Sequence, residues 1–214
     1  MFFFSSAPEN VILNKKFRGN DMKICVYGAS GEKLRQEYFD AAYALGALMA
    51  ENGHTLIYGG GQTGLMGAVG RGAHDKGGEI IGVAPKFFDE PGVLSPDCTE
   101  FIFTETMRER KHIMEDMADA FIVLPGGIGT FEEFFETLTL KQLGRHTKPM
   151  ALLNTLGYYN KLCAAMDFAA EGGFVAQSCL ELYALCASPE DALRRVLCAE
   201  PDSSAEHSIF SYNR

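Results

Sequence analysis

The sequence lacks a long hydrophobic run and an excess of positive charge. No apolar segment approaches the roughly 20 residues that cross a bilayer, so we expect no membrane partner. The formal net charge is −9, and basic residues form no block. Because sequence-independent binding to nucleic acids depends on many cationic contacts with phosphates, we expect no nucleic-acid partner. Any phosphate site therefore needs a local positive region.

The sequence also has no CxxC pair among its six cysteines. Most of them lie within apolar stretches, as expected of reduced core thiols in a cytosolic protein. Nothing in their spacing supports a zinc site. The apolar residues 1–7 lack a basic flank and are too short for a signal peptide. We therefore expect a cytoplasmic protein without a bound metal.

Short apolar runs alternate with helical patterns along most of the 214 residues. We predict a single domain over 22–199, preceded by a flexible extension (1–21) and followed by a polar tail (200–214). The alternation, without a hairpin signal, predicts an α/β fold with a parallel sheet covered on both faces. The predicted strands are 23–27, 55–58, 79–84, 101–103, 120–124 and 150–153; the predicted helices are 34–52, 65–76, 107–117 and 158–170, with another helix after residue 130 and a final strand–helix pair ending near 198.

The most informative motif is the run Pro125-Gly126-Gly127-Ile128-Gly129-Thr130-Phe131-Glu132-Glu133. It lies between a predicted strand and a predicted helix. Such a turn leaves backbone N–H groups free at a helix N-terminus, where the helix dipole favours an anion. The two glutamates follow about one turn inside the helix. The motif thus predicts a phosphate-binding turn with carboxylates beside it.

Two more glycine-rich turns follow predicted strands. The turn Gly28-x-Ser30-Gly31 is only half of a dinucleotide fingerprint, and a structural turn explains it as well as a ligand does. The run 59–61 has three consecutive glycines, which favours close approach of the backbone to a ligand over simple packing. Glycine and alanine at 67, 68 and 72 predict close packing of the next helix on the sheet. All three turns should meet at one edge of the sheet.

A cationic cluster, Arg108, Arg110 and Lys111, lies in the predicted helix 107–117. In isolation it could be a solvated helix face. Its position one strand before the glycine motif places both at the same sheet edge, which favours a role in the site. Among the acids, Glu133 and Glu136 share one helical face, so at least one of them should only cap or solvate the helix. The five histidines show no ligand or triad spacing.

Together these motifs resemble the LOG family of cytokinin riboside 5′-monophosphate phosphoribohydrolases, formerly described as lysine decarboxylases. The resemblance covers residues 23–198 and includes 59–67, Arg110-Lys111 and the motif 125–133 in the family's order and spacing. It implies a Rossmann-like three-layer α/β/α fold and a homodimer. It also implies hydrolysis of a nucleoside 5′-monophosphate to free base and ribose 5-phosphate, without any cofactor.

The resemblance assigns Arg110 and Glu133 as the catalytic pair. The family commonly has histidine where this chain has Arg108, and its first glycine turn commonly contains cysteine. The predicted substrate-binding residues are Ser30, Gly60, Gly61, Met66, Glu90, Lys111, Gly126, Gly127, Ile128, Gly129, Thr130, Glu132 and Thr139.

The residue types suit this chemistry. Cleavage of an N-glycosidic bond passes through an oxocarbenium-like transition state. A carboxylate such as Glu133 can stabilise that charge and orient or deprotonate water, with Glu132 in support. Arg110 would hold ribose or phosphate oxygens or stabilise the departing base. Two alternatives stay open: a broader hydrolase acting on AMP and related nucleotides, and a non-catalytic module that binds nucleotides or carries a cofactor.

Overall fold

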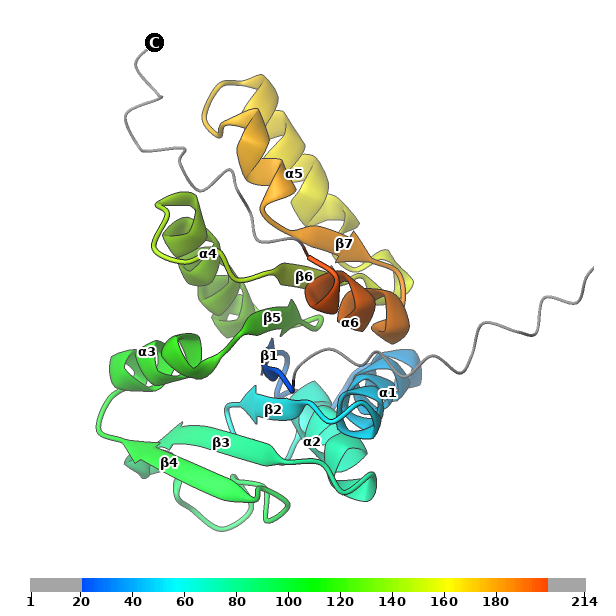
Figure 1. The fold of residues 1–214 in the computed structure, drawn as a ribbon, viewed down its shortest axis with the longest axis vertical. Coiled ribbons are helices and arrows are strands. Elements are labelled where there is room, and N and C mark those ends of the chain that lie inside the picture. Colours follow the sequence, from blue (N-terminus) through cyan, green and yellow to red (C-terminus); the bar gives the residue numbers. More distant parts are fainter. Residues whose placement is uncertain (1–20, 200–214) are drawn as a thin grey trace, which may run out of the picture.

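The computed structural model describes residues 21–199 and contains one seven-stranded parallel sheet. The strand order is β4-β3-β2-β1-β5-β6-β7, so the chain builds outward from β1 in both directions (Figure 1). The strands are β1 (Lys23–Tyr27), β2 (Thr55–Tyr58), β3 (Ile80–Pro85), β4 (Glu100–Thr104), β5 (Ala120–Val123), β6 (Met150–Leu153) and β7 (Ala184–Cys186). The reversal between β1 and β5 is the point where ligands bind in open α/β sheets.

Central strands are buried on both faces. Strands β2, β3, β5 and β6 are buried along their whole length, whereas the edge strands β4 and β7 are partly exposed. This pattern explains why the central strands read as continuous apolar runs. The predicted α/β fold with a covered parallel sheet is confirmed.

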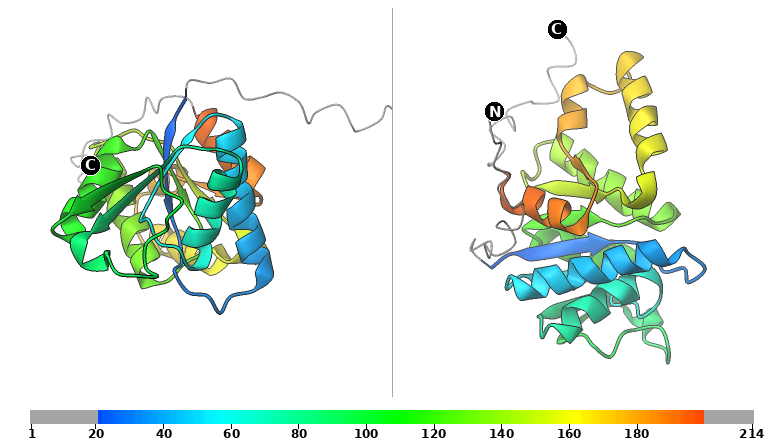
Figure 2. Two further views of the ribbon diagram at one scale, coloured as in Figure 1. Left: turned by 90° about the horizontal axis from the view of Figure 1, so that it is seen from below. Right: turned by 90° about the vertical axis from the view of Figure 1, so that its right-hand side faces the viewer.

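Helices cover the two faces in sets of three (Figures 1 and 2). Helices α1, α2 and α6 pack on one core, which contains Ile24, Val26 and Ile122 of the sheet. Helices α3, α4 and α5 pack on the other, which contains the alternate residues Cys25, Tyr27 and Phe121. The helices are α1 (Gln36–Glu51), α2 (Gly64–Asp75), α3 (Met107–Met117), α4 (Ile128–Gln142), α5 (Asn160–Glu171) and α6 (Pro189–Leu197).

The small residues of α2 serve helix–helix packing more than helix–sheet packing. A Cβ atom on Gly72 would lie 2.0 Å from the carbonyl oxygen of Tyr43 in α1, and one on Gly46 would lie 2.0 Å from that of Val69 in α2. A Cβ on Gly67 would meet the carbonyl of Gln62, just before α2, at 1.9 Å. Packing of Gly67 and Gly72 on the sheet was thus the wrong expectation, because their close contacts are with the preceding turn and α1.

The three glycine-rich turns lie together, as predicted. The Ala29 N–H donates to Pro125 O at 3.1 Å, and the Leu65 N–H donates to Ala29 O at 2.8 Å. Thr63 Oγ1 donates to Ser30 O at 3.0 Å. The turn after β1 therefore bridges the turns after β2 and β5, and it fixes their relative positions through backbone groups.

The segment between β3 and β4 folds back onto the turn after β2. It begins with a 3-10 helix, Lys86–Phe88. Gln62 N–H then donates to Val93 O at 3.0 Å, and Ser95 N–H donates to Gly60 O at 2.7 Å. These two hydrogen bonds connect the segment to the turn after β2, at the carboxyl edge of the sheet.

The predicted extension over 1–21, apart from Asp21, and the tail over 200–214 lie outside the described residues. All six cysteines are free thiols, and Cys25, Cys179 and Cys186 are buried. No helix within residues 21–199 has the length and apolar character needed to cross a membrane. In the same range, histidine, cysteine and carboxylate side chains form no cluster suited to a metal ion.

Candidate active site

Helix α3 carries the cations of the site, and its N-terminus is fixed by a capping box. Thr106 caps the helix by accepting from the Glu109 N–H at 3.1 Å, and Glu109 accepts in return from the Thr106 N–H at 3.3 Å. This reciprocal capping box satisfies free backbone donors at the helix N-terminus. Arg110 follows in the first turn, at the carboxyl edge of the sheet between β3 and β5.

Arg110 and Glu133 form a buried ion pair. Arg110 Nη1 lies 2.8 Å from Glu133 Oε1, and the two side chains are only 7% and 12% exposed. Arg110 Nε also donates to Val83 O at 3.1 Å, at the end of β3. Removing one partner of such a pair costs roughly 3 to 5 kcal/mol, because the other charge stays buried and unpaired. The pair thus has one defined geometry, anchored to the sheet.

Gly59 makes room for the guanidinium. A Cβ atom at this position would lie 2.3 Å from Arg110 Nη2 and 2.6 Å from Met66 Cε. Gly60 is required for a different reason. Its φ is +71°, and a Cβ would lie 2.5 Å from the ring of Phe101. A Cβ on Gly61 would meet nothing closer than 3.7 Å. The three glycines therefore serve separate purposes, and two of them are explained by contacts within the protein.

Burial raises the pKa of Glu133, and the charge and hydrogen bond of Arg110 only partly oppose that shift. The raised pKa follows from the loss of water around the carboxylate. Only Oε1 of Glu133 meets Arg110. The second oxygen, Oε2, has no hydrogen-bond partner within residues 21–199 and is available to a ligand or a water molecule.

The turn after β5 exposes backbone donors. Gly127 is the N-cap of α4 and has no capping side chain, and a Cβ on Gly127 or Gly129 would meet nothing within 4 Å. Ile128 is 88% exposed. Gly126 is buried and lies against Thr130, whose Oγ1 would be 2.1 Å from a Cβ there. The turn therefore has an open face lined by first-turn N–H groups, which suits an anion.

Lys111 is the next residue after Arg110, and two carboxylates compensate its charge. Its ammonium is paired with Glu132, and it lies 2.5 Å from Glu136 Oε2. Burial lowers the pKa of Lys111, but hydrogen bonds to the two glutamates outweigh burial and raise it. The expectation that either Glu133 or Glu136 would only cap or solvate the helix was wrong, because each contacts a different cation of α3.

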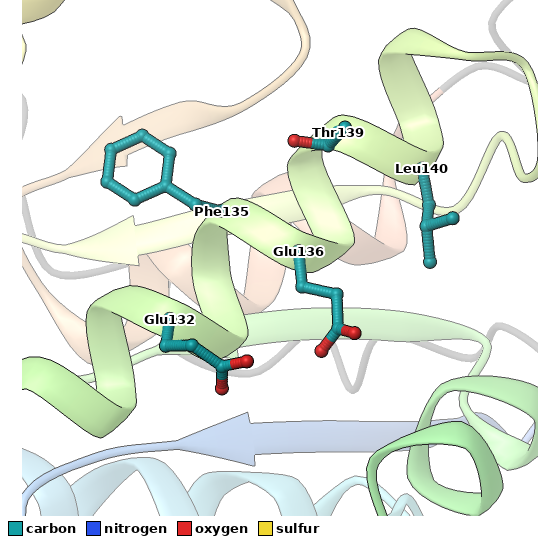
Figure 3. Close-up of a pocket in the computed structure, with 5 residues that line it drawn as sticks. All are labelled: Glu132, Phe135, Glu136, Thr139 and Leu140. Carbon is teal, nitrogen blue, oxygen red and sulfur yellow. The ribbon is translucent and has the colours of Figure 1, made fainter. Parts of the chain in front are cut away.

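Thr139 lies away from the glycine turn. It lines a shallow hollow of about 400 Å³ on the outer face of α4, together with Glu132, Phe135, Glu136 and Leu140 (Figure 3). At 1.5 Å per residue, Thr139 lies roughly 16 Å along the helix from its start. Within a single chain, the structure separates Thr139 from the turn after β5.

The remaining predicted contacts surround the turn after β2. Met66 covers Gly59, and the exposed Ser30 lies in the turn after β1. Glu90 is exposed in the segment that folds over Gly61, and its side chain makes no hydrogen bond or ion pair with another described residue. The structure thus brings Arg110, Glu133, Met66 and the glycine turns together, but it shows no side-chain contact between Glu90 and this group.

Comparison with known proteins identifies the family. Residues 66–196 match the family model described as "Possible lysine decarboxylase". A cytokinin riboside 5′-monophosphate phosphoribohydrolase of Arabidopsis thaliana is 42% identical over 156 residues, which is 73% of either chain. The enzyme with this name from Mycobacterium tuberculosis is 39% identical over 81% of this chain and 92% of its own. The chain belongs to the LOG family.

Solved structures show that the LOG fold extends to proteins with other names. The molybdenum cofactor carrier protein of Chlamydomonas reinhardtii superposes with a TM-score of 0.65 at 25% identity, covering 84% of this chain and 99% of its own. A molybdenum cofactor binding protein of Rippkaea orientalis gives a TM-score of 0.63 at 24% identity, over 81% and 94%. The Rossmann-like architecture expected for a LOG protein is thereby confirmed.

Sequence reasoning missed four residues that support the site. Val83 binds Arg110 through its carbonyl group, which leaves no mark in the sequence. Glu136 pairs with Lys111, and its spacing of four residues from Glu132 was the available signal. Tyr158 and Tyr159 contact the turn after β5. Apart from being adjacent to each other, they carry no sequence signal of this role.

Substitution of Gly59 tests the geometry of the ion pair. In Gly59→Ala, the new Cβ should displace the Arg110 guanidinium and Met66, so we expect kcat/KM to fall at least about tenfold, the result of losing about 1.4 kcal/mol of transition-state stabilisation. Gly61→Ala is the matched control and should have a clearly smaller effect. Steady-state kinetics of both variants measures this, and equal losses would contradict the role given to Gly59.

Proposed function

We propose that the protein hydrolyses the N-glycosidic bond of nucleoside 5′-monophosphates, cytokinin riboside monophosphates in particular. The observation that carries this proposal is the buried Arg110–Glu133 pair beside an open turn of backbone donors. Relatives that are 39 to 44% identical bear the name of this activity. The pair provides the acid that binding alone would not need, and the turn provides a site for a 5′-phosphate.

Glu133 has the chemistry for bond cleavage. As the C1′–N bond breaks, its electron pair leaves with the base and positive charge develops on the ribose. The carboxylate stabilises that charge, and Oε2 can orient the attacking water and accept its proton. The water oxygen forms the new bond to C1′, and the departing base takes up a proton. The products are free base and ribose 5-phosphate.

Arg110 and the turn after β5 hold the substrate. Arg110 Nη1 and Nε are occupied by Glu133 and Val83, which leaves Nη2 to meet ribose or phosphate oxygens or the departing base. The N–H groups at the start of α4 would bind the 5′-phosphate, with help from the helix dipole. Lys111 would act more weakly, because two carboxylates already compensate its charge.

Decarboxylation with pyridoxal phosphate fits this site poorly. A Schiff-base lysine must lose its proton to react. Lys111 is the lysine at this site, and its contacts with Glu132 and Glu136 hold its pKa above the usual range. A cofactor carrier, the other alternative, shares the fold at 24 to 25% identity. The higher identity to named phosphoribohydrolases and the presence of Glu133 favour the hydrolase.

Release of free base is the direct test. Incubation with AMP and with isopentenyladenosine monophosphate should release adenine or isopentenyladenine, detected by chromatography, and the ratio of the two rates reports base preference. Glu133→Gln keeps the size and the acceptor for Arg110 but removes the charge, so kcat should fall by about 10²- to 10⁴-fold.

Glu132→Gln is the matched control, since it makes the same chemical change one residue away. Glu132 is 53% exposed and pairs with Lys111, so the variant should lose far less kcat than Glu133→Gln. Absence of base release from either nucleotide would rule out the hydrolase. Undiminished release by Glu133→Gln would remove that residue from its role.

The pH dependence follows from the raised pKa of Glu133. The reaction uses the ionised carboxylate, so kcat/KM should fall on acidification with a midpoint above the ordinary glutamate value of about 4.3. Glu132→Gln should keep this acid limb, and the residual activity of Glu133→Gln should lose it. If the activity of the parent enzyme fell with a midpoint at or below about pH 4.3, the assignment of Glu133 would be contradicted.

We further propose that the protein is a homodimer, as the family resemblance implies. Phe134 and Leu138 are buried in the core, but Phe135 and Leu143 of the same helical segment are 36% and 38% exposed. Phe135 also lines the hollow that contains Thr139. Sedimentation analysis should give about twice the monomer mass of 23.4 kDa, and a monomer at micromolar concentration would rule the dimer out.

A further inference from the structure

Two adjacent tyrosines between β6 and α5 reach the turn after β5. The segment that carries them is held in a fixed shape: Leu156 has φ +54°, and Asn154 Oδ1 accepts from the Tyr159 N–H at 2.7 Å. Positive φ is unusual for a residue with a branched side chain, and it persists only where the surroundings impose it. The two rings therefore have a defined placement next to the site.

Each hydroxyl group donates to one backbone carbonyl of that turn. Tyr158 Oη donates to Gly126 O at 2.5 Å, and Tyr159 Oη donates to Leu124 O at 2.6 Å. The Tyr158 ring also stacks on Phe131, in the first turn of α4, with ring centroids 6.5 Å apart. Tyr158 is 37% exposed, whereas Tyr159 is 1% exposed.

The two hydrogen bonds have different consequences, because of the peptide units that they engage. In a trans peptide, the C=O and N–H groups point in opposite directions, and the structure has no cis peptide among the described residues. The carbonyl held by Tyr158 shares its peptide with the Gly127 N–H. That N–H must therefore point away from Tyr158, and it has no hydrogen-bond partner among residues 21–199.

The carbonyl held by Tyr159 shares its peptide with Pro125, which has no N–H. Tyr159 can therefore stabilise the turn, but it cannot aim a donor. This difference separates the two tyrosines although they are adjacent, chemically identical and bonded to the same turn.

We propose that Tyr158 is a positioning residue for the anion site: its hydroxyl fixes the Gly126–Gly127 peptide so that the Gly127 N–H faces the 5′-phosphate of the substrate. This inference rests on the function proposed above. The hydrogen bond also polarises the peptide, which strengthens the N–H as a donor. Tyr158 acts through the backbone and does not take part in bond cleavage.

The test compares Tyr158→Phe with Tyr159→Phe. Each variant loses one hydroxyl and one hydrogen bond to the same turn. In Tyr158→Phe, phosphate binding should weaken equally in the ground and transition states, so KM for AMP should rise about five- to tenfold with kcat unchanged. In Tyr159→Phe, KM should stay within about twofold, while the melting temperature falls because a buried donor–acceptor pair is lost.

Binding of ribose 5-phosphate, measured by calorimetry, provides a readout that needs no catalysis. The dissociation constant should rise by the same factor as KM in Tyr158→Phe and stay near the parent value in Tyr159→Phe. Equal changes in the two variants, or a loss of kcat without a change in KM, would overturn the positioning role. Failure of the parent protein to release base would contradict the proposed hydrolase alone, because the calorimetric comparison still tests Tyr158.

Discussion

The site is organised around one buried ion pair, Arg110 with Glu133. Two charges removed from water need each other and further polar contacts, and the structure provides these through Val83 O and the space above Gly59. The pair joins α3 to α4 across the carboxyl ends of β3 and β5. The neighbouring turns must therefore fit around it.

Hydrogen bonds to backbone groups hold the turns around this ion pair in place. The turn after β1 binds the other two glycine turns through main-chain hydrogen bonds, and two tyrosine hydroxyls hold carbonyls of the turn after β5. Such contacts are short and directional. The bond from Tyr158 restrains the peptide that carries the Gly127 N–H, whereas the bond from Tyr159 only stabilises the turn. A local positive potential of this kind is compatible with the net negative charge of the whole protein.

Much of the fold could be predicted because its physical signals are local. Apolar runs of four to six residues identified the central strands. Residues 107–117 were predicted as a helix with the bounds that the structure shows for α3. The packing of α2 was misjudged, because glycine spacing says that something comes close without saying whether it is a sheet or a helix.

What the sequence determined by itself was the set of chemical groups and their order: a parallel α/β sheet, glycine turns at one edge, and cations and carboxylates on the helices beside them. These follow from periodicity and from the geometry of parallel strands. Only the tertiary structure decided the partners: Arg110 with Glu133, Lys111 with Glu132 and Glu136, Gly59 with the guanidinium, and Tyr158 with Gly126. The reason is physical: a contact between two elements depends on the distance between them and on their burial in the fold, and no single segment of sequence encodes either.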